Sequence, residues 1–151
     1  MFYGCVSLTY INTTNWNLTN SIKITTLFYN CQKLQSIGST SNWNVSKCQN
    51  MQWFMSNCPS IEQIDIANWN LSACQNIGDF VANCTYLKTL CPNGWIQPLD
   101  MSTVTNCNNW TGNTPMLTSI PPFTNVKPGM NVPLNSAPLS RDCVAVFDQA
   151  G

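Results

Sequence analysis

The sequence predicts an α/β solenoid in which each turn of about 26 residues contains one short strand and one short helix. Two ladders of residues share this period. The first ladder consists of tryptophans, at Trp16, Trp43, Trp69 and Trp95. The second consists of cysteines, at Cys5, Cys31, Cys58 and Cys84. A unit of this length cannot bury its own apolar side, so the units are expected to stack on one another.

The repeated part covers residues 1–120, as four good turns and a degenerate fifth. In each good copy the cysteine is followed at a spacing of three by two aliphatic residues, as in Cys31, Leu34 and Ile37. The fifth copy has Thr114, Leu117 and Ile120 in these places. Because stacking puts equivalent side chains above one another, we expect the four tryptophans to form one buried column that is the principal stabiliser.

Within each copy, residue spacing predicts the local elements. Short alternating segments predict strands at 8–13, 34–39, 61–66 and 87–92. Apolar residues three or four positions apart predict helical turns at 21–29, 48–56 and 74–82. The Asn-Trp-Asn boxes at Trp16, Trp43 and Trp69 lie between these elements and are typical of turns, because short amide side chains bond to nearby backbone.

The last part of the chain, residues 121–151, has a different composition. A proline-rich stretch beginning near Pro115 is incompatible with a helix or a central strand, which predicts an irregular cap. A short closing helix is expected over residues 138–148, with Ser140 as its N-cap.

Composition and charge exclude several functions. The chain has six Lys and Arg against six Asp and Glu, so its net charge is zero and no basic field attracts nucleic acid. It has no histidine, the usual general base and a common zinc ligand. Glu62 and Asp65 are the nearest approach to a paired acid site, without a basic neighbour. We expect no catalytic residues, no metal and no cofactor.

No apolar run is long enough to span a membrane. Met1 leads into Phe2 and Tyr3 without a basic region or a long apolar region, so no secretory signal is visible in this sequence. The nine cysteines allow disulfides, a metal site or buried thiols. In-register neighbours have parallel Cβ vectors about 4.8 Å apart, beyond the usual disulfide range, so stacked cysteines are expected to be free thiols. The remaining candidates for pairing are Cys91, Cys107 and Cys143.

The pattern F-x-x-C-x-x-L-x-x-I, followed by W-N and apolar residues at spacing three, resembles the BspA-type leucine-rich repeats. It is most similar to their 26-residue bacterial surface-protein variant, which also occurs in phage appendage proteins. Asn17, Asn44 and Asn70 stand where that variant usually has Asp. The resemblance implies a right-handed leucine-rich-repeat-like coil with strands on its concave side, a role in binding or adhesion, and a further module after the terminal helix. It does not imply catalysis.

The candidate binding residues are the outward-facing strand positions of the expected concave side. They are Tyr10, Asn12, Gln35, Ser36, Glu62, Gln63, Asp65, Lys88 and Thr89. The expected function is a non-enzymatic recognition or adhesion module of an extracellular, cell-surface or virion appendage protein. Its expected partner is a protein or glycan on a cell surface, or a neighbouring subunit. The alternatives are a structural spacer or capsid-associated scaffold, and an accessory module of an enzyme.

Overall fold

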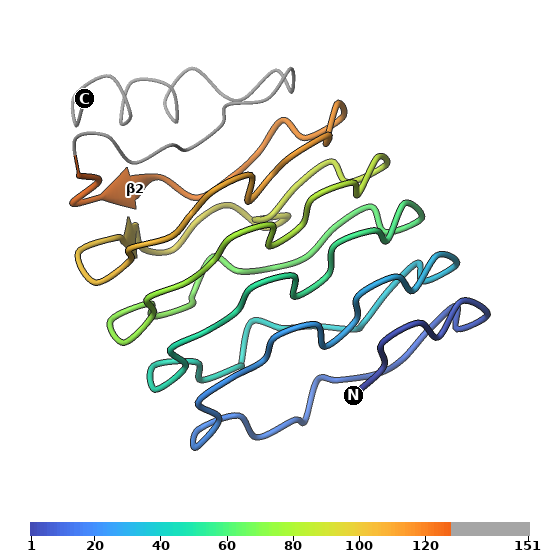
Figure 1. The fold of residues 1–151 in the computed structure, drawn as a ribbon, viewed down its shortest axis with the longest axis horizontal. Coiled ribbons are helices and arrows are strands. Elements are labelled where there is room, and N and C mark those ends of the chain that lie inside the picture. Colours follow the sequence, from blue (N-terminus) through green and yellow to red (C-terminus); the bar gives the residue numbers. More distant parts are fainter. Residues whose placement is uncertain (128–151) are drawn as a thin grey trace.

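The chain folds into a stack of similar layers, each an elongated loop of irregular backbone (Figure 1). The computed structural model describes residues 1–127. Hydrogen bonds between backbone groups about one repeat apart join each layer to the next, such as Phe28 N to Phe54 O at 2.9 Å and Met55 N to Phe80 O at 2.9 Å. Each layer therefore bonds mainly to its neighbours in the stack.

The predicted α/β solenoid is wrong. The described residues contain no helix, and their only strands are β1 (Leu99–Asp100) and β2 (Phe123–Thr124), a short parallel pair. A closed coil of one strand and one helix per turn, right-handed and leucine-rich-repeat-like, is therefore not what this chain forms. The helix expected over residues 138–148 lies outside the described residues.

The segments predicted to be helical contain a left-handed residue, which breaks a right-handed helix. Thr26, Trp53 and Asp79 have φ values of 52°, 54° and 50°. A second left-handed position follows four residues later, at Asn30, Asn57 and Asn83, with φ near 60°. The backbone turns a corner at each of these residues and sends its N–H groups to the next layer.

Turns, not helices, explain the apolar spacing of three. Cys31 N donates to Phe28 O at 3.2 Å, and Leu34 N donates to Cys31 O at 3.1 Å. Bonds of this i to i+3 type recur in other layers, between Cys48 and Val45 and between Cys74 and Leu71. Consecutive turns place every third side chain inside, and this spacing is also that of one face of a helix.

The predicted strands at 8–13, 34–39, 61–66 and 87–92 are reduced to single-residue bridges. Tyr10 pairs with Ser36 and Gln63 pairs with Thr89, both in parallel. Thr89 also pairs with Ser119. Turns on both sides interrupt the pairing before longer strands form. A second row of parallel bridges runs along another side of the stack, through Lys23, Asn50, Asn76 and Asn106.

Stacked indoles form a column through the first three copies. The ring centroids of Trp16 and Trp43 are 5.9 Å apart, and those of Trp43 and Trp69 are 5.8 Å apart, with interplanar angles of 4° and 12°. Two of the indole N–H groups donate to a carbonyl of the preceding layer, Trp43 to Thr13 and Trp69 to Thr40, both at 3.1 Å. The rings of Trp43 and Trp69 are thus buried with their polar atoms satisfied.

The prediction that Trp95 belongs to this column is wrong. Trp95 is 54% exposed, and Leu99 packs into the core instead. The turn that ends at Cys74 begins at Leu71, two positions after Trp69, and the equivalent turn begins at Met101, two positions after Leu99. The loop at 91–98 therefore contains a four-residue insertion. The β-bridges show the same insertion, because the step from Asn76 to its bridge partner Asn106 is four positions longer than the step from Asn50 to Asn76.

The repeat-position cysteines are thiols that bond across layers. Cys31, Cys58 and Cys84 donate from Sγ to the carbonyls of Phe2, Phe28 and Met55 at 2.9, 2.9 and 3.0 Å. Burial raises the pKa of Cys58, and raises the pKa of Cys84 from its ordinary value of 9.0 to about 12. The structure also has Cys91 as a free thiol and buries Cys107, whereas Cys143 lies outside the described residues.

Candidate functional site

The nine predicted binding residues all lie at exposed or half-buried positions, alternating with buried aliphatic side chains. Tyr10, for example, is 57% exposed and lies next to Ile11, which packs against the core. The bridges align Tyr10 with Ser36 and Gln63 with Thr89. These residues therefore form one polar face of the stack.

A groove with a volume of about 190 Å³ lies beside this face. It brings together three of the predicted residues, Ser36, Gln63 and Asp65, from two adjacent layers. Its other lining residues are Gly38, Ser39, Ile64, Pro92 and Asn93. We call this the polar groove. The third layer contributes through the loop at 91–98, which supplies Pro92 and Asn93.

The backbone around Gly38 shapes one wall of the polar groove. Gly38 has a φ of 75°, and its N–H donates to Ser36 Oγ at 3.1 Å. A Cβ at this position would lie 2.9 Å from Asn12 Oδ1 and 3.3 Å from Thr13 N. Asn12 Oδ1 already accepts the Thr14 N–H at 3.1 Å. Glycine is therefore required here both by its left-handed conformation and by the close approach of the first layer.

Polar atoms that face the polar groove retain free hydrogen-bonding capacity. Asp65 Oδ1 accepts the Ala67 N–H at 3.1 Å, which fixes the direction of the carboxylate. Among residues 1–127, no ion pair involves Asp65, and the side-chain amides of Gln63 and Asn93 have no hydrogen-bond partner. The groove therefore offers one oriented carboxylate and two amides, each with both donors and an acceptor.

The other predicted residues contribute less to this groove. Lys88 Nζ and Glu62 Oε2 are 2.8 Å apart in an exposed ion pair that links two layers. Thr89 Oγ1 accepts the Cys91 N–H at 3.0 Å. Gln35, Tyr10 and Asn12 lie on the same face without lining the groove. Of the nine predicted residues, three therefore line the groove, while the Glu62–Lys88 pair links two layers.

A second polar hollow of about 280 Å³ lies over the Asn-Trp-Asn boxes of two layers. Its asparagines are largely engaged by their own turns. Asn44 Oδ1 accepts from Ser46 N and Oγ at 3.1 and 2.7 Å, and Asn70 Oδ1 accepts from Ser72 N at 2.8 Å. These asparagines shape turns, as their side-chain chemistry predicts, and leave fewer groups for a ligand than the polar groove does.

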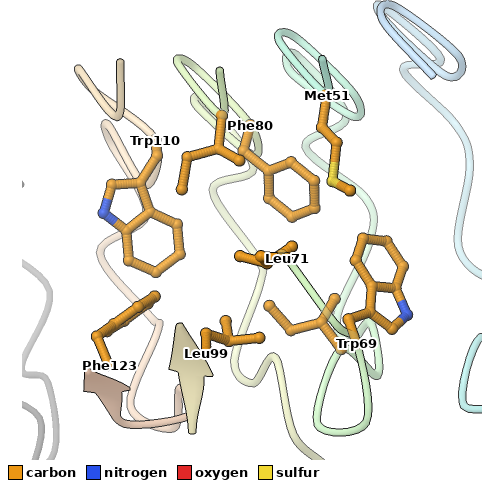
Figure 2. A pocket seen from close by; sticks show the side chains of 9 residues that line it. Met51, Trp69, Leu71, Phe80, Leu99, Trp110 and Phe123 are labelled. Carbon is orange, nitrogen blue, oxygen red and sulfur yellow. The ribbon is translucent and has the colours of Figure 1, made fainter. Parts of the chain in front are cut away.

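The core also contains a small apolar void of about 20 Å³ (Figure 2). In Figure 2, Trp110 and Phe123 lie on the left of the group and Met51 and Trp69 on the right, with Phe80, Leu71 and Leu99 between them. A space this small, lined by apolar side chains, holds no ligand and stays dry. It lies where Leu99 replaces an indole, so it follows from the loss of Trp95 from the column.

The sequence contains a signal for the insertion in the loop that carries Pro92 and Asn93. The step from Cys84 to its equivalent Thr114 is four positions longer than the step from Cys58 to Cys84. The tryptophan ladder conceals this difference, because Trp95 follows Trp69 at the usual spacing of 26 positions. The buried position equivalent to Trp69 is occupied by Leu99 instead. Gly38 and Ser39 lie inside the segment predicted as a strand at 34–39, and the sequence contains no separate signal for them as groove residues.

Two absences concern the described residues only. None of residues 1–127 belongs to a group of three or more His, Cys, Asp or Glu side chains able to hold a metal ion. In the same part of the chain, no helix has the length and apolarity needed to cross a membrane.

The stack and the groove define a repeat protein whose layers present a neutral polar face. Within that class, residues 1–120 match the family model described as Mycoplasma protein of unknown function, DUF285, and the chain belongs to this family. No curated protein and no solved structure matches the chain.

Proposed function

We propose that this chain is a non-enzymatic recognition module of a cell-surface or virion appendage protein, which binds a partner surface through its polar face. The polar groove is the observation that supports this proposal. It gathers Ser36, Gln63 and Asp65 from successive layers, with amide groups unengaged by the rest of the described residues. The resemblance to BspA-type repeats favours the same role.

The charge and chemistry of the groove favour binding over catalysis. Asp65 is the one charged residue in its lining, and no second carboxylate, thiol or basic group of the described residues lies there to share proton transfer. A set of hydroxyl, amide and carboxylate groups on a rigid stack suits recognition through directed hydrogen bonds.

Binding of the fluorescently labelled intact chain to cells and to immobilised surface extracts tests this function. The Gln63→Ala variant is expected to reduce the bound fraction severalfold, because it removes an unengaged amide from the groove. Gln49→Ala is the matched control, since Gln49 is also exposed and does not line the groove. Equal binding by both variants and the unmodified chain would contradict the proposal.

A structural spacer is the second candidate, and the first layer favours it. No charged side chain precedes Lys23 in the sequence. Phe2, Leu8 and Trp16 pack against the core yet remain partly exposed, and Met1 is 87% exposed. An uncharged layer with accessible apolar groups suits contact with another subunit. Light scattering over a range of protein concentrations tests it, and a monomer at all concentrations would count against this role.

A further inference from the structure

We infer that the polar groove binds one neutral sugar ring, with the exposed Trp95 as the surface on which the ring stacks. This inference rests on the proposed function and specifies its ligand class. A pyranose ring has C–H groups on its faces and hydroxyl groups at its edge. It is recognised by an aromatic plane placed next to oriented hydrogen-bonding side chains.

Trp95 is available for stacking because the insertion removes it from the core. Its side chain is 54% exposed, although a large aromatic group of this kind is normally kept from water. Trp95 lies two positions after Asn93, which lines the groove, so their Cα atoms are at most about 7.6 Å apart. Trp95 is not among the lining residues of the groove, but this separation is short enough for its indole ring to cover a sugar bound at the groove opening.

Hydrogen bonds hold the loop that carries Trp95 against the preceding layer. Gly94 N donates to Cys91 O at 3.0 Å, and the N–H groups of Ile96 and Gln97 both donate to Ala67 O at 3.4 Å. Gln97 Nε2 also donates to Trp69 O at 3.3 Å. Ala67 is the residue whose own N–H orients Asp65. The aromatic surface and the carboxylate are therefore positioned by the same short segment.

The groove chemistry matches the hydroxyl edge of a sugar. Asp65 accepts strong hydrogen bonds from hydroxyl donors, and the amides of Gln63 and Asn93 both donate and accept. A volume of about 190 Å³ is below the range of about 300–1,000 Å³ that is typical of drug-sized ligands, which indicates a single ring. The carboxylate of Asp65 repels anionic sugars, so the ligand class is neutral.

The test is a titration of the intact chain with neutral hexose and N-acetylhexosamine oligosaccharides, and with sialylated and sulfated counterparts, followed by tryptophan fluorescence. Trp95→Ala is expected to raise the Kd for the neutral oligosaccharides at least tenfold. Tyr86→Ala is the matched control, because Tyr86 is 57% exposed and does not line the groove. This control is expected to bind within twofold of the unmodified chain.

A second pair of variants tests the carboxylate. Asp65→Asn keeps the acceptor for the Ala67 N–H and removes the charge, and is expected to weaken binding about tenfold, because hydrogen bonds to charged groups are the stronger ones. Asp100→Asn is the matched control, because Asp100 Oδ1 likewise accepts the N–H two residues later, from Ser102 at 2.9 Å, and Asp100 does not line the groove. This control removes one charge elsewhere and is expected to leave the Kd unchanged. Unchanged melting temperatures for all four variants show that folding is intact.

The remaining outcomes separate the inference from the function on which it rests. Preference for sialylated or sulfated oligosaccharides, or neutral binding that Trp95→Ala and Asp65→Asn leave intact, overturns the inference. Absence of oligosaccharide binding, together with cell binding that Gln63→Ala reduces, overturns the inference while the recognition role stands. Absence of any binding that depends on the groove overturns both.

Discussion

Tryptophans in this chain differ in their contribution to stability according to whether their ring enters the column. Trp69 is 1% exposed, stacks on Trp43, and donates to Thr40 O, whereas Trp95 is 54% exposed. Trp69→Ala is therefore expected to lower the free energy of unfolding by about 3–5 kcal/mol. Trp95→Ala is expected to change it by less than about 0.5 kcal/mol. Urea denaturation measures both, and similar losses for the two variants would refute the assignment.

The buried thiols make stability depend on alkaline pH. Burial raises the pKa of Cys74 and of Cys84 to about 12, above the ordinary value of 9.0 that the unfolded chain has. Above pH 9 the unfolded chain loses these protons while the folded chain keeps them, so folding stability is fully present below about pH 9 and falls as the pH rises toward 12.

Each such thiol is expected to lower the free energy of unfolding by about 1.4 kcal/mol per pH unit in that window. Chemical denaturation at several pH values between about 8 and 11 measures the slope. Cys84→Ala is the control. It should decrease the slope of the unfolding free energy against pH by the contribution of one thiol. A slope that this variant leaves unchanged would show that other groups cause the alkaline loss.

At the scale of elements, the left-handed corner inside a segment predicted as helix can be tested directly. Asp79 has a φ of 50° and accepts the Asn109 amide at Oδ1 at 2.7 Å. Asp79→Gly and Asp79→Ala both lose that bond, so they differ in backbone preference alone. Glycine is expected to be the more stable variant by about 1 kcal/mol, because only alanine is strained in the left-handed region.

A helix at 74–82 would reverse this order, since alanine is favoured over glycine by about 1 kcal/mol within a helix. Thermal or urea unfolding of the two variants therefore distinguishes the corner from a helix in one comparison.

The sequence predicts which side chains face inward better than it predicts the backbone. The spacing of Cys31, Leu34 and Ile37 correctly indicates buried positions, because an interior side chain every third residue suits both a helix and a run of turns. The backbone hydrogen bonds distinguish a helix from a run of turns. A helix bonds within its own segment, whereas many backbone N–H groups here bond to a different layer. Asn30, Asn57 and Asn83 were a usable signal for corners, since asparagine tolerates the left-handed region better than most residues.

The candidate site was predictable in the same partial way. Alternation along the segments at 34–39 and 61–66 indicated Ser36, Gln63 and Asp65 as outward-facing, and the groove contains all three. The loop that completes the groove was not predicted, because Trp95 keeps the tryptophan period while the core follows Leu99. The insertion leaves the spacing of the tryptophans unchanged and lengthens the step from Cys84 to Thr114. It is therefore visible only when the cysteine ladder is followed into the fifth copy.

For the molecule as a whole, protection against hydrogen exchange is expected to vary along the stack. Inner layers are bonded on both sides, as at Met55, whereas Phe2 and Gly4 lie in a layer with a neighbour on one side among the described residues. We expect the amides of Phe2 and Gly4 to exchange at least tenfold faster than those of Met55 and Asn57. Mass-spectrometric or NMR exchange measures this, and uniform rates would indicate one cooperative unit.

The bonds that join layers also bear on how the chain reaches its native state. A backbone hydrogen bond between groups one repeat apart forms only after the intervening loop has closed. Closing that loop costs conformational entropy before the contacts between the two layers stabilise the chain. Folding is then nucleated by two adjacent copies meeting, and later copies add to an existing template. The chain should consequently refold slowly for its size, as proteins dominated by non-local pairing do.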